Sequence, residues 1–339
     1  MFFVCATRPK FVKPVLFFSG VSVAVTTTYY SLFSEAPSPS PSRFTPSTLI
    51  ESVDVSSNTK LLTLSVPPGL IPSDPGAFTS TWSIFVKDSD IQVERPYTPL
   101  EGIDENGHMK LWVKKYKHGE VSRWLHSRQV GDSIEIRGPV TTWSKSWQNG
   151  HWDEVVMART SIFFSFIDIL TSPCKVSGGT GITPFYQLLH SVFRTRNTSF
   201  NACFTLLHAS RSLADLPPST MIHSLTELSQ NYPDKFQFHL FTDSVDDTSE
   251  SHSLSIRHGH IGKSVVQDAL RLTHSTPWWH RLFGSSVPTI PEKRILVLVC
   301  GPEGMVSAIA GPYGRNYSQG KVGGILGELG LQSHQVWKL

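Results

Sequence analysis

A glycine-rich turn near the middle of the chain has the residue types of a phosphate-binding loop. It contains Gly178, Gly179, Thr180 and Gly181, and a predicted helix over 183–192 follows it directly. Backbone amides without side-chain cover at a helix N-terminus attract a phosphate group through hydrogen bonds and the helix dipole. Taken alone, the turn favours an anion site and a purely structural turn about equally.

A second run, Arg95-Pro96-Tyr97-Thr98-Pro99, ends a predicted strand. An arginine suits a phosphate, an aromatic ring can lie against a planar cofactor, and a hydroxyl can hydrogen-bond the edge of that cofactor. In isolation the simpler interpretation is a strand end that turns at two prolines.

Two further candidates are Lys114 to Leu125 and Leu298 to Met305. In the first, Ser122 and the amides after Gly119 open a short helix that can receive a pyrophosphate, although a capped surface helix has the same pattern. In the second, Cys300 stands at the carboxyl end of a strand, where parallel sheets bind ligands. A small buried hydrophobe is the simpler interpretation of that cysteine.

The segment over 45–140 predicts an antiparallel β-barrel. Short strand-like runs alternate there with Pro- and Gly-rich turns, and one helical run is expected at Glu120 to Ser127. Many short strands separated by such turns are typical of a barrel. The expected strands are Leu49 to Val55, Lys60 to Val66, Thr81 to Val86, Val93 to Tyr97, Lys110 to Tyr116 and Ser133 to Ile136.

After Gly138-Pro139 the pattern changes, and the segment over 141–339 predicts an α/β domain. Strands now alternate with helices, which implies a parallel sheet covered by helices on both faces. The expected elements are a strand at Asp153 to Met157, Phe204 to Ala209, a helix at Met221 to Gln230, Phe236 to Phe241, a helix at Ser264 to Leu270, and Arg294 to Val299.

Composition excludes several classes of function. The chain has 339 residues and a formal net charge of +3, which is too small to indicate nucleic-acid binding. Its four cysteines are scattered without a CxxC pair, which argues against a zinc ribbon or a disulfide framework. There is no HExxH motif, and Arg257-His258-Gly259-His260 is interpreted as a polar loop, so we expect no metal site.

The N-terminal residues predict a membrane anchor. Arg8, Lys10 and Lys13 precede the uncharged stretch 14–33, which is long enough to span a bilayer core, and no acid occurs before Glu35. The alternative is a cleaved signal peptide, although no A-x-A-like cleavage site follows the stretch. We expect a mitochondrial-type targeting segment over 1–13, a transmembrane anchor over 14–33 and a Pro/Ser linker over 34–44.

The excess of basic residues before the anchor also predicts its orientation. The positive-inside tendency would keep the basic end in the mitochondrial matrix. The globular part would then face the intermembrane space from the inner membrane.

Together, and in this order, the four candidate runs resemble the ferredoxin-NADP reductase superfamily, and in particular its NADH-cytochrome b5 reductase branch. The resemblance covers roughly residues 45–310 and rests on Arg-x-Tyr-Thr, Lys-x-Tyr-x-x-Gly-x-x-Ser-x-x-Leu, Gly-Gly-Thr-Gly-Ile-Thr-Pro and Cys-Gly-Pro-x-x-Met. It implies that the barrel binds FAD and the parallel sheet binds NADH. A hydride would pass from nicotinamide to flavin N5, and electrons would leave singly to a haem protein.

The same resemblance assigns roles in FAD binding. Arg95 would contact the pyrophosphate, Tyr97 would lie against the isoalloxazine, and Thr98 would hydrogen-bond near N5. The second flavin segment would comprise Lys114, Tyr116, Val121 and Ser122, with Thr183 also near the flavin.

For NADH, the resemblance makes the glycine turn the pyrophosphate site and places Cys300 beside the nicotinamide, where it would orient the ring. Thr98 and Cys300 would therefore lie nearest the chemistry. Asp215 falls where an acid repels a 2′-phosphate and favours NADH, although Arg211 nearby acts in the opposite direction. The NADH residues implied are Gly178, Gly179, Thr180, Gly181, Asp215, Cys300, Gly301, Pro302 and Met305.

The chain continues past the point where cytochrome b5 reductases usually end. This tail, with the anchor and linker, resembles the fungal cytochrome c mitochondrial import factors. That resemblance implies an inner-membrane flavoprotein that supports haem attachment to cytochrome c beside the haem lyase complex. Haem iron must be ferrous for attachment, and a tethered NADH-dependent flavoprotein would keep it ferrous. Two alternatives stay open: an outer-membrane reductase of cytochrome b5, and a non-catalytic flavin-binding assembly factor.

One segment does not fit the family pattern. The family passes from strand to glycine turn almost directly, whereas here Ala158 to Val176 intervenes after the strand that ends at Met157. We interpret 158–176 as an insertion, and our hypothesis is that it is translated from an unspliced intron. A genuine insertion and a different choice of strand are the alternatives.

Overall fold

The computed structural model describes residues 42–70, 81–143, 152–160, 180–194, 202–243, 256–271 and 294–339. All of them lie in one compact unit, Pro39–Leu339, which is separate from Met1–Ser38. The predicted targeting segment and anchor therefore fall outside the described residues, as does nearly all of the linker. Within the ranges described, no helix combines the length and the apolar composition that crossing a bilayer requires.

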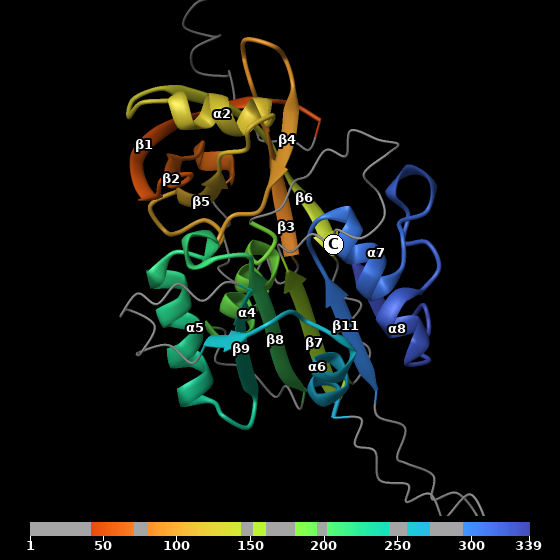
Figure 1. Cartoon of the computed structure of the whole chain (residues 1–339). Helices are drawn as coiled ribbons and strands as arrows, with labels where there is room; N and C mark the ends of the chain where they lie inside the picture. Colours follow the sequence, from red (N-terminus) through yellow and green to blue (C-terminus); the bar gives the residue numbers. More distant parts are fainter. Residues whose placement is uncertain are drawn as a thin grey trace, which may run out of the picture. The chain divides into compact units, whose positions relative to one another are not determined.

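The N-terminal domain contains a six-stranded antiparallel sheet in the order β4-β3-β6-β1-β2-β5, which confirms the predicted antiparallel domain (Figure 1). Its core includes Trp82, Ile84, Leu111 and Leu125, all almost fully buried. The elements are β1 (Thr45–Ser56), β2 (Thr59–Ser65), the 3-10 turn η1 (Pro68–Leu70), β3 (Thr81–Lys87), β4 (Glu94–Tyr97), β5 (His108–Lys114), α2 (Glu120–Ser127) and β6 (Ser133–Trp143).

The C-terminal domain contains a six-stranded parallel sheet in the order β10-β9-β8-β7-β11-β12, as the alternation of strands and helices predicts. The strands are β7 (Glu154–Thr160), β8 (Cys203–Ser210), β9 (Phe236–Thr242), β10 (Ile256–His258), β11 (Ile295–Val299) and β12 (Val336–Lys338). The helices are α4 (Thr183–Arg194), α5 (Ser219–Asn231), α6 (Lys263–Ala269), α7 (Glu303–Ala310) and α8 (Gly324–Glu328), with 3-10 turns η2 (Leu213–Asp215) and η5 (Arg315–Tyr317).

Alternate residues of the central strands face two separate hydrophobic cores, because successive side chains of a strand point to opposite faces. Val155 and Met157 pack with residues of α4 and α5. Val156 and Ala158 pack with residues of α6, α7 and α8. The sheet is therefore covered on both faces, and Figure 1 shows α4 and α5 on one side and α7 and α8 on the other.

Two boundaries differ from the sequence-based expectation. β7 does not end at Met157: Ala158 pairs with both Leu207 and Val299, and the strand continues to Thr160. Three residues assigned to the insertion thus belong to the central strand, because their backbone continues the ladder on the β8 side. Residues 161–176 lie outside the described part, so the insertion itself stays a prediction. β6 likewise crosses the expected domain boundary at 140.

The tail after α7 folds back onto the parallel sheet, which the sequence did not predict. β12 pairs in parallel with β11, and Leu339 donates a backbone hydrogen bond of 2.8 Å to Val299 O. The segment 257–260, which was predicted to be a polar loop, also differs from that prediction, because Arg257 and His258 belong to the edge strand β10.

Candidate functional site

The first flavin motif lies on β4 and the residues that follow it. Arg95 is exposed, and its Nη1 donates a hydrogen bond of 2.7 Å to Glu94 O. Tyr97 is partly buried, and burial raises the pKa of its phenol, so it stays neutral. The hydroxyls of Thr98 and Ser83 share a hydrogen bond of 2.9 Å. A cation, a ring and a hydroxyl therefore follow one another along a single strand end.

The second flavin motif forms a tight turn before α2. Ser122 Oγ donates to Gly119 O at 3.1 Å and accepts from the backbone N–H of Tyr116 at 3.3 Å. A Cβ added at Gly119 would lie 2.5 Å from Ser122 Oγ and 2.9 Å from Tyr116 Cβ. The side chains of Ser122 and Tyr116 therefore leave no space for a side chain at position 119. The side chain of Val121 is buried in the core of the N-terminal domain, and its role in flavin binding stays a prediction.

The glycine turn is described from Thr180 onward, and Gly178 and Gly179 lie outside the described residues. Thr183 caps the start of α4: its N–H and its Oγ1 both donate to Thr180 O, at 3.0 and 2.8 Å. A Cβ at Gly181 would lie 3.3 Å from Cys300 Sγ. The turn therefore packs directly against the carboxyl end of β11, as a shared cofactor site requires.

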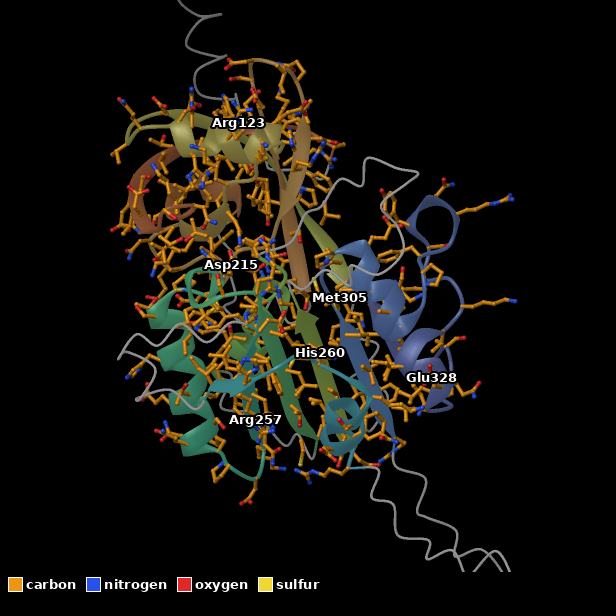
Figure 2. All side chains as sticks on the ribbon, in the orientation of Figure 1. Arg123, Asp215, Arg257, His260, Met305 and Glu328 are labelled. Atoms are coloured by element: carbon orange, nitrogen blue, oxygen red, sulfur yellow. The ribbon has the colours of Figure 1, made fainter. Side chains whose placement is uncertain are left out.

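Cys300 follows β11, and its N–H donates to Ala158 O at 3.2 Å. Burial raises the pKa of its thiol to about 11, although Arg159 nearby partly opposes the shift. The thiol is therefore neutral at pH 7 and unsuited to act as a nucleophile. Pro302 and Met305 are buried at the start of α7, which follows this strand end directly in the chain. Figure 2 labels Met305 there.

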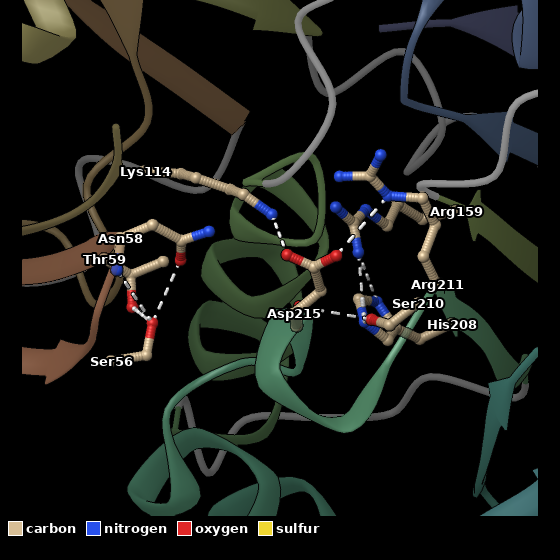
Figure 3. Close-up of polar contacts among 9 residues, drawn as sticks. All are labelled: Ser56, Asn58, Thr59, Lys114, Arg159, His208, Ser210, Arg211 and Asp215. Atoms are coloured by element: carbon tan, nitrogen blue, oxygen red, sulfur yellow. Dashed lines mark hydrogen bonds and ion pairs between the residues drawn. The ribbon is translucent and has the colours of Figure 1, made fainter. Parts of the chain in front are cut away.

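A buried ion pair joins the two domains at this site. Lys114, the last residue of β5, contacts Asp215 of η2, and Arg211 Nε lies 3.4 Å from the other carboxylate oxygen of Asp215 (Figure 3). The side chains of Lys114 and Asp215 are only 5% and 11% exposed. Burial raises the pKa of Asp215, but the hydrogen bond and the charge of Lys114 outweigh this, so the net pKa lies below its usual value.

The structure thus brings together a predicted flavin residue and a predicted NADH residue that are 101 positions apart in the sequence. Tyr116 belongs to the same group, since Arg159, Asp215 and Arg211 all influence its pKa, which burial raises to about 12.

Sequence reasoning missed two residues of this group, Arg159 and His208. Both are fully buried on adjacent strands, and Arg159 Nη1 lies 3.0 Å from His208 Nε2. His208 Nε2 in turn lies 3.0 Å from Ser210 Oγ, which donates to Asp215 O at 3.3 Å. The sequence did contain a signal for Arg159. It is a charged residue directly after the apolar run Val155 to Ala158, at the end of a parallel strand where ligands bind.

Two family models match the chain. The oxidoreductase FAD-binding domain matches residues 46–144, and the oxidoreductase NAD-binding domain matches residues 176–311. The chain therefore belongs to the ferredoxin-NADP reductase superfamily and is similar to the cytochrome b5 reductases. It is an NADH-dependent flavoprotein oxidoreductase with FAD and NADH as cofactors.

The curated relatives include NADH-cytochrome b5 reductase 2 of Meyerozyma guilliermondii, 27% identical over 293 residues that cover 86% of this chain and 82% of that protein. NADH-cytochrome b5 reductase 2 of Candida albicans is 24% identical over 336 residues, covering 97% and 96%. Among solved structures, the cytochrome b5 reductase domain of Ulva prolifera nitrate reductase has a TM-score of 0.59 at 19% identity, covering 90% of this chain and 100% of that one. That similarity confirms the fold.

The described residues fit the two cofactors. Neighbouring atoms leave little space for a side chain at either glycine: a Cβ would lie 2.5 Å from Ser122 Oγ at Gly119 and 3.3 Å from Cys300 Sγ at Gly181. Arg95 is an exposed cation, whereas Lys114 and Arg211 are paired with the carboxylate of Asp215. The neutral phenols of Tyr97 and Tyr116 suit contact with a planar ring.

Proposed function

We propose that this reductase passes electrons from NADH through FAD to a haem protein. The observation that carries the proposal is the Lys114–Asp215 contact, which holds a residue of the flavin motif against a predicted NADH residue. Bound FAD would supply the link between NADH, which gives up two electrons as a hydride, and an acceptor that takes electrons one at a time. The printed names of the curated relatives support a cytochrome as acceptor.

The chain's own residues would bind and orient the cofactors. Arg95 and the turn at Gly119 would hold the FAD phosphates, Tyr97 would pack on the ring, and Thr98 would hydrogen-bond its edge. Cys300, kept as a neutral thiol by burial, would orient the nicotinamide without reacting with it.

The finer part of the proposal is support of haem attachment to cytochrome c from the mitochondrial inner membrane. It rests on the uncharged stretch over 14–33, the basic residues before it, the Pro/Ser linker and the tail after Cys-Gly-Pro. An outer-membrane reductase of cytochrome b5 is the second candidate, and the names of the curated relatives favour it. A flavin-binding assembly factor without turnover is the candidate from another class.

An anaerobic NADH titration of the purified chain tests the catalytic proposal. We expect a yellow protein whose flavin absorbance bleaches with one equivalent of NADH. A colourless protein would exclude both flavin-based functions, and a yellow protein that NADH does not bleach would favour the non-catalytic factor. Rates with haemin plus apocytochrome c, compared with rates with cytochrome b5, then identify the acceptor.

A further inference from the structure

The strand β12 brings Leu339 beside Cys300 at the carboxyl end of the parallel sheet. Val299 pairs with Lys338, and the N–H of Leu339 donates a hydrogen bond of 2.8 Å to Val299 O. Cys300 is the next residue of its own segment, so it and Leu339 are neighbours across the sheet. Both side chains pack against the core on the face that α4 and α5 cover. In Figure 1 the label C lies at this end of β11, beside α7.

A single hydroxyl fixes the backbone of Leu339. Tyr313, three residues after α7, donates a hydrogen bond of 2.9 Å from its Oη to Leu339 O. The pKa of Tyr313 is raised to about 12, chiefly by burial and also by Cys300 and Glu303, so the phenol keeps its proton at pH 7. Tyr313 therefore stays a hydrogen-bond donor, and it lies close enough to Cys300 for the two groups to interact.

The loop that carries this tyrosine, residues 311–323 between α7 and α8, is packed too tightly for side chains at two of its glycines. A Cβ at Gly311 would lie 2.7 Å from Gly323 N, and a Cβ at Gly320 would lie 2.6 Å from Pro312 O. Both glycines have a positive φ, 82° and 62°. Backbone atoms make these contacts, so the loop has one closely packed conformation in which it can hold the tyrosine.

Two further side chains join the loop to β12. Gln319 pairs with the backbone of Lys338 in both directions: its Oε1 accepts the N–H at 2.7 Å, and its Nε2 donates to the carbonyl oxygen at 2.9 Å. Lys338 Nζ donates in return to Pro312 O at 2.7 Å and to Lys321 O at 3.2 Å. The loop and the strand are therefore held as one unit, and the tyrosine extends it to the residue beside the cysteine.

We propose that Tyr313 is a positioning residue for hydride transfer, which holds Leu339 in one place beside Cys300 at the nicotinamide end of the site. It acts through the backbone of Leu339 and does not itself react. The inference deepens the proposed function and rests on it, because the nicotinamide beside Cys300 is part of that proposal. A nicotinamide that packs against a fixed surface is held in the geometry of transfer more often than one that packs against a mobile segment.

Anaerobic stopped-flow reduction of the flavin by NADH tests this role. The limiting rate at saturating NADH reports transfer from the nicotinamide. The inhibition constant of ADP-ribose, which lacks the nicotinamide, reports binding of the rest of the dinucleotide. We expect Tyr313→Phe to lower the limiting rate about fivefold, as one lost hydrogen bond would, and to leave the inhibition constant unchanged.

Tyr317→Phe is the matched control, since it removes a hydroxyl from a neighbouring tyrosine of the same loop. The two rings lie 6.0 Å apart, but Tyr317 is 81% exposed. This variant should reduce its flavin at the wild-type rate. A second variant covers the case in which Tyr313→Phe does not fold. Gln319→Met removes both hydrogen bonds to Lys338 and should lower the limiting rate in the same direction, again without a change for ADP-ribose.

A wild-type limiting rate in Tyr313→Phe, or in Gln319→Met if the first does not fold, overturns the inference. Equal weakening of ADP-ribose also overturns it, because that is the result of a general structural role. The same loss of rate in Tyr317→Phe would show that the effect does not depend on the hydrogen bond to Leu339, and it overturns the inference too.

One comparison separates this inference from the function on which it rests. If NADH fails to bleach the flavin of the wild type, the proposed function fails and the inference fails with it. If NADH bleaches the flavin of the wild type and of Tyr313→Phe at equal rates, the positioning role alone fails.

Discussion

At the scale of single residues, Gly119 is a position where the flavin turn has no room for a side chain. A Cβ there would lie 2.5 Å from Ser122 Oγ, closer than any van der Waals contact allows. We expect Gly119→Ala to lower the free energy of unfolding by about 1–3 kcal/mol and to reduce the fraction of protein that retains FAD. Flavin absorbance per mole of purified protein is the measurement.

Gly304→Ala is the matched control for this prediction, since a Cβ at Gly304 in α7 would meet open space. FAD retention should be unchanged in that variant. Normal flavin content in Gly119→Ala would contradict the role of this turn.

His208 predicts a specific dependence of stability on pH. Burial, with the charge of Arg159, holds its pKa well below the usual 6.5, so the unfolded chain binds a proton that the folded protein does not. Stability should therefore be lost as the pH falls below 6.5. Between pH 7.5 and 5.5 the wild type should lose about 1.4 kcal/mol more than His208→Gln in denaturant unfolding.

His223→Gln is the control for the pH experiment, because the side chain of His223 is 82% exposed. This variant should keep the wild-type pH dependence. Parallel pH profiles for the wild type and His208→Gln would show that His208 binds protons equally in the folded and unfolded chain, so that folding does not lower its pKa.

At the scale of secondary-structure elements, one buried cation joins β12 to the segment between α7 and α8. Lys338 Nζ donates to Pro312 O at 2.7 Å and to Lys321 O at 3.2 Å. Burial lowers the pKa of Lys338. We expect Lys338→Met to keep the aliphatic packing but to lower the free energy of unfolding by about 1.5–3 kcal/mol, since hydrogen bonds to a charged group are lost.

The exposed Lys321 of the same segment gives the control, because only its backbone carbonyl takes part in this contact. Lys321→Met should be as stable as the wild type in the same denaturant titration. Equal stability of both variants would mean that the strand pairing alone holds the tail.

At the scale of the whole described unit, Gln187 connects the two domains. From helix α4 its Oε1 accepts the backbone N–H of Trp82 at 2.9 Å, and its Nε2 donates to Pro99 O at 3.0 Å. Gln187→Leu would leave a buried donor and a buried acceptor without partners, at a cost of about 1–3 kcal/mol each. We expect calorimetry to show separate unfolding of the two domains in this variant.

Gln230→Leu on the exposed end of α5 is the comparison for this experiment. It should unfold as the wild type does. A single unchanged transition in Gln187→Leu would show that other contacts, such as Lys114 with Asp215, suffice to couple the domains.

The sequence by itself determined the local elements and the class of cofactor. Helix α2 begins and ends where its pattern predicts, and most strands lie within a few residues of their expected positions, because side-chain periodicity reflects local burial. The exceptions are β10 and β12, which were not expected, and β6, which continues past its expected end at Ile136 to Trp143. The four motifs likewise indicated FAD and NADH before any contact was known.

Only the tertiary structure decided which distant residues meet. The pairing of Lys114 with Asp215, the buried Arg159 beside His208, and the anchoring of β12 by Lys338 join segments that no local pattern relates. A charged residue has the same helix or strand propensity whether the fold places it at the surface or within a site. Its role depends on the packing of elements around it, which the periodicity of a single segment does not contain.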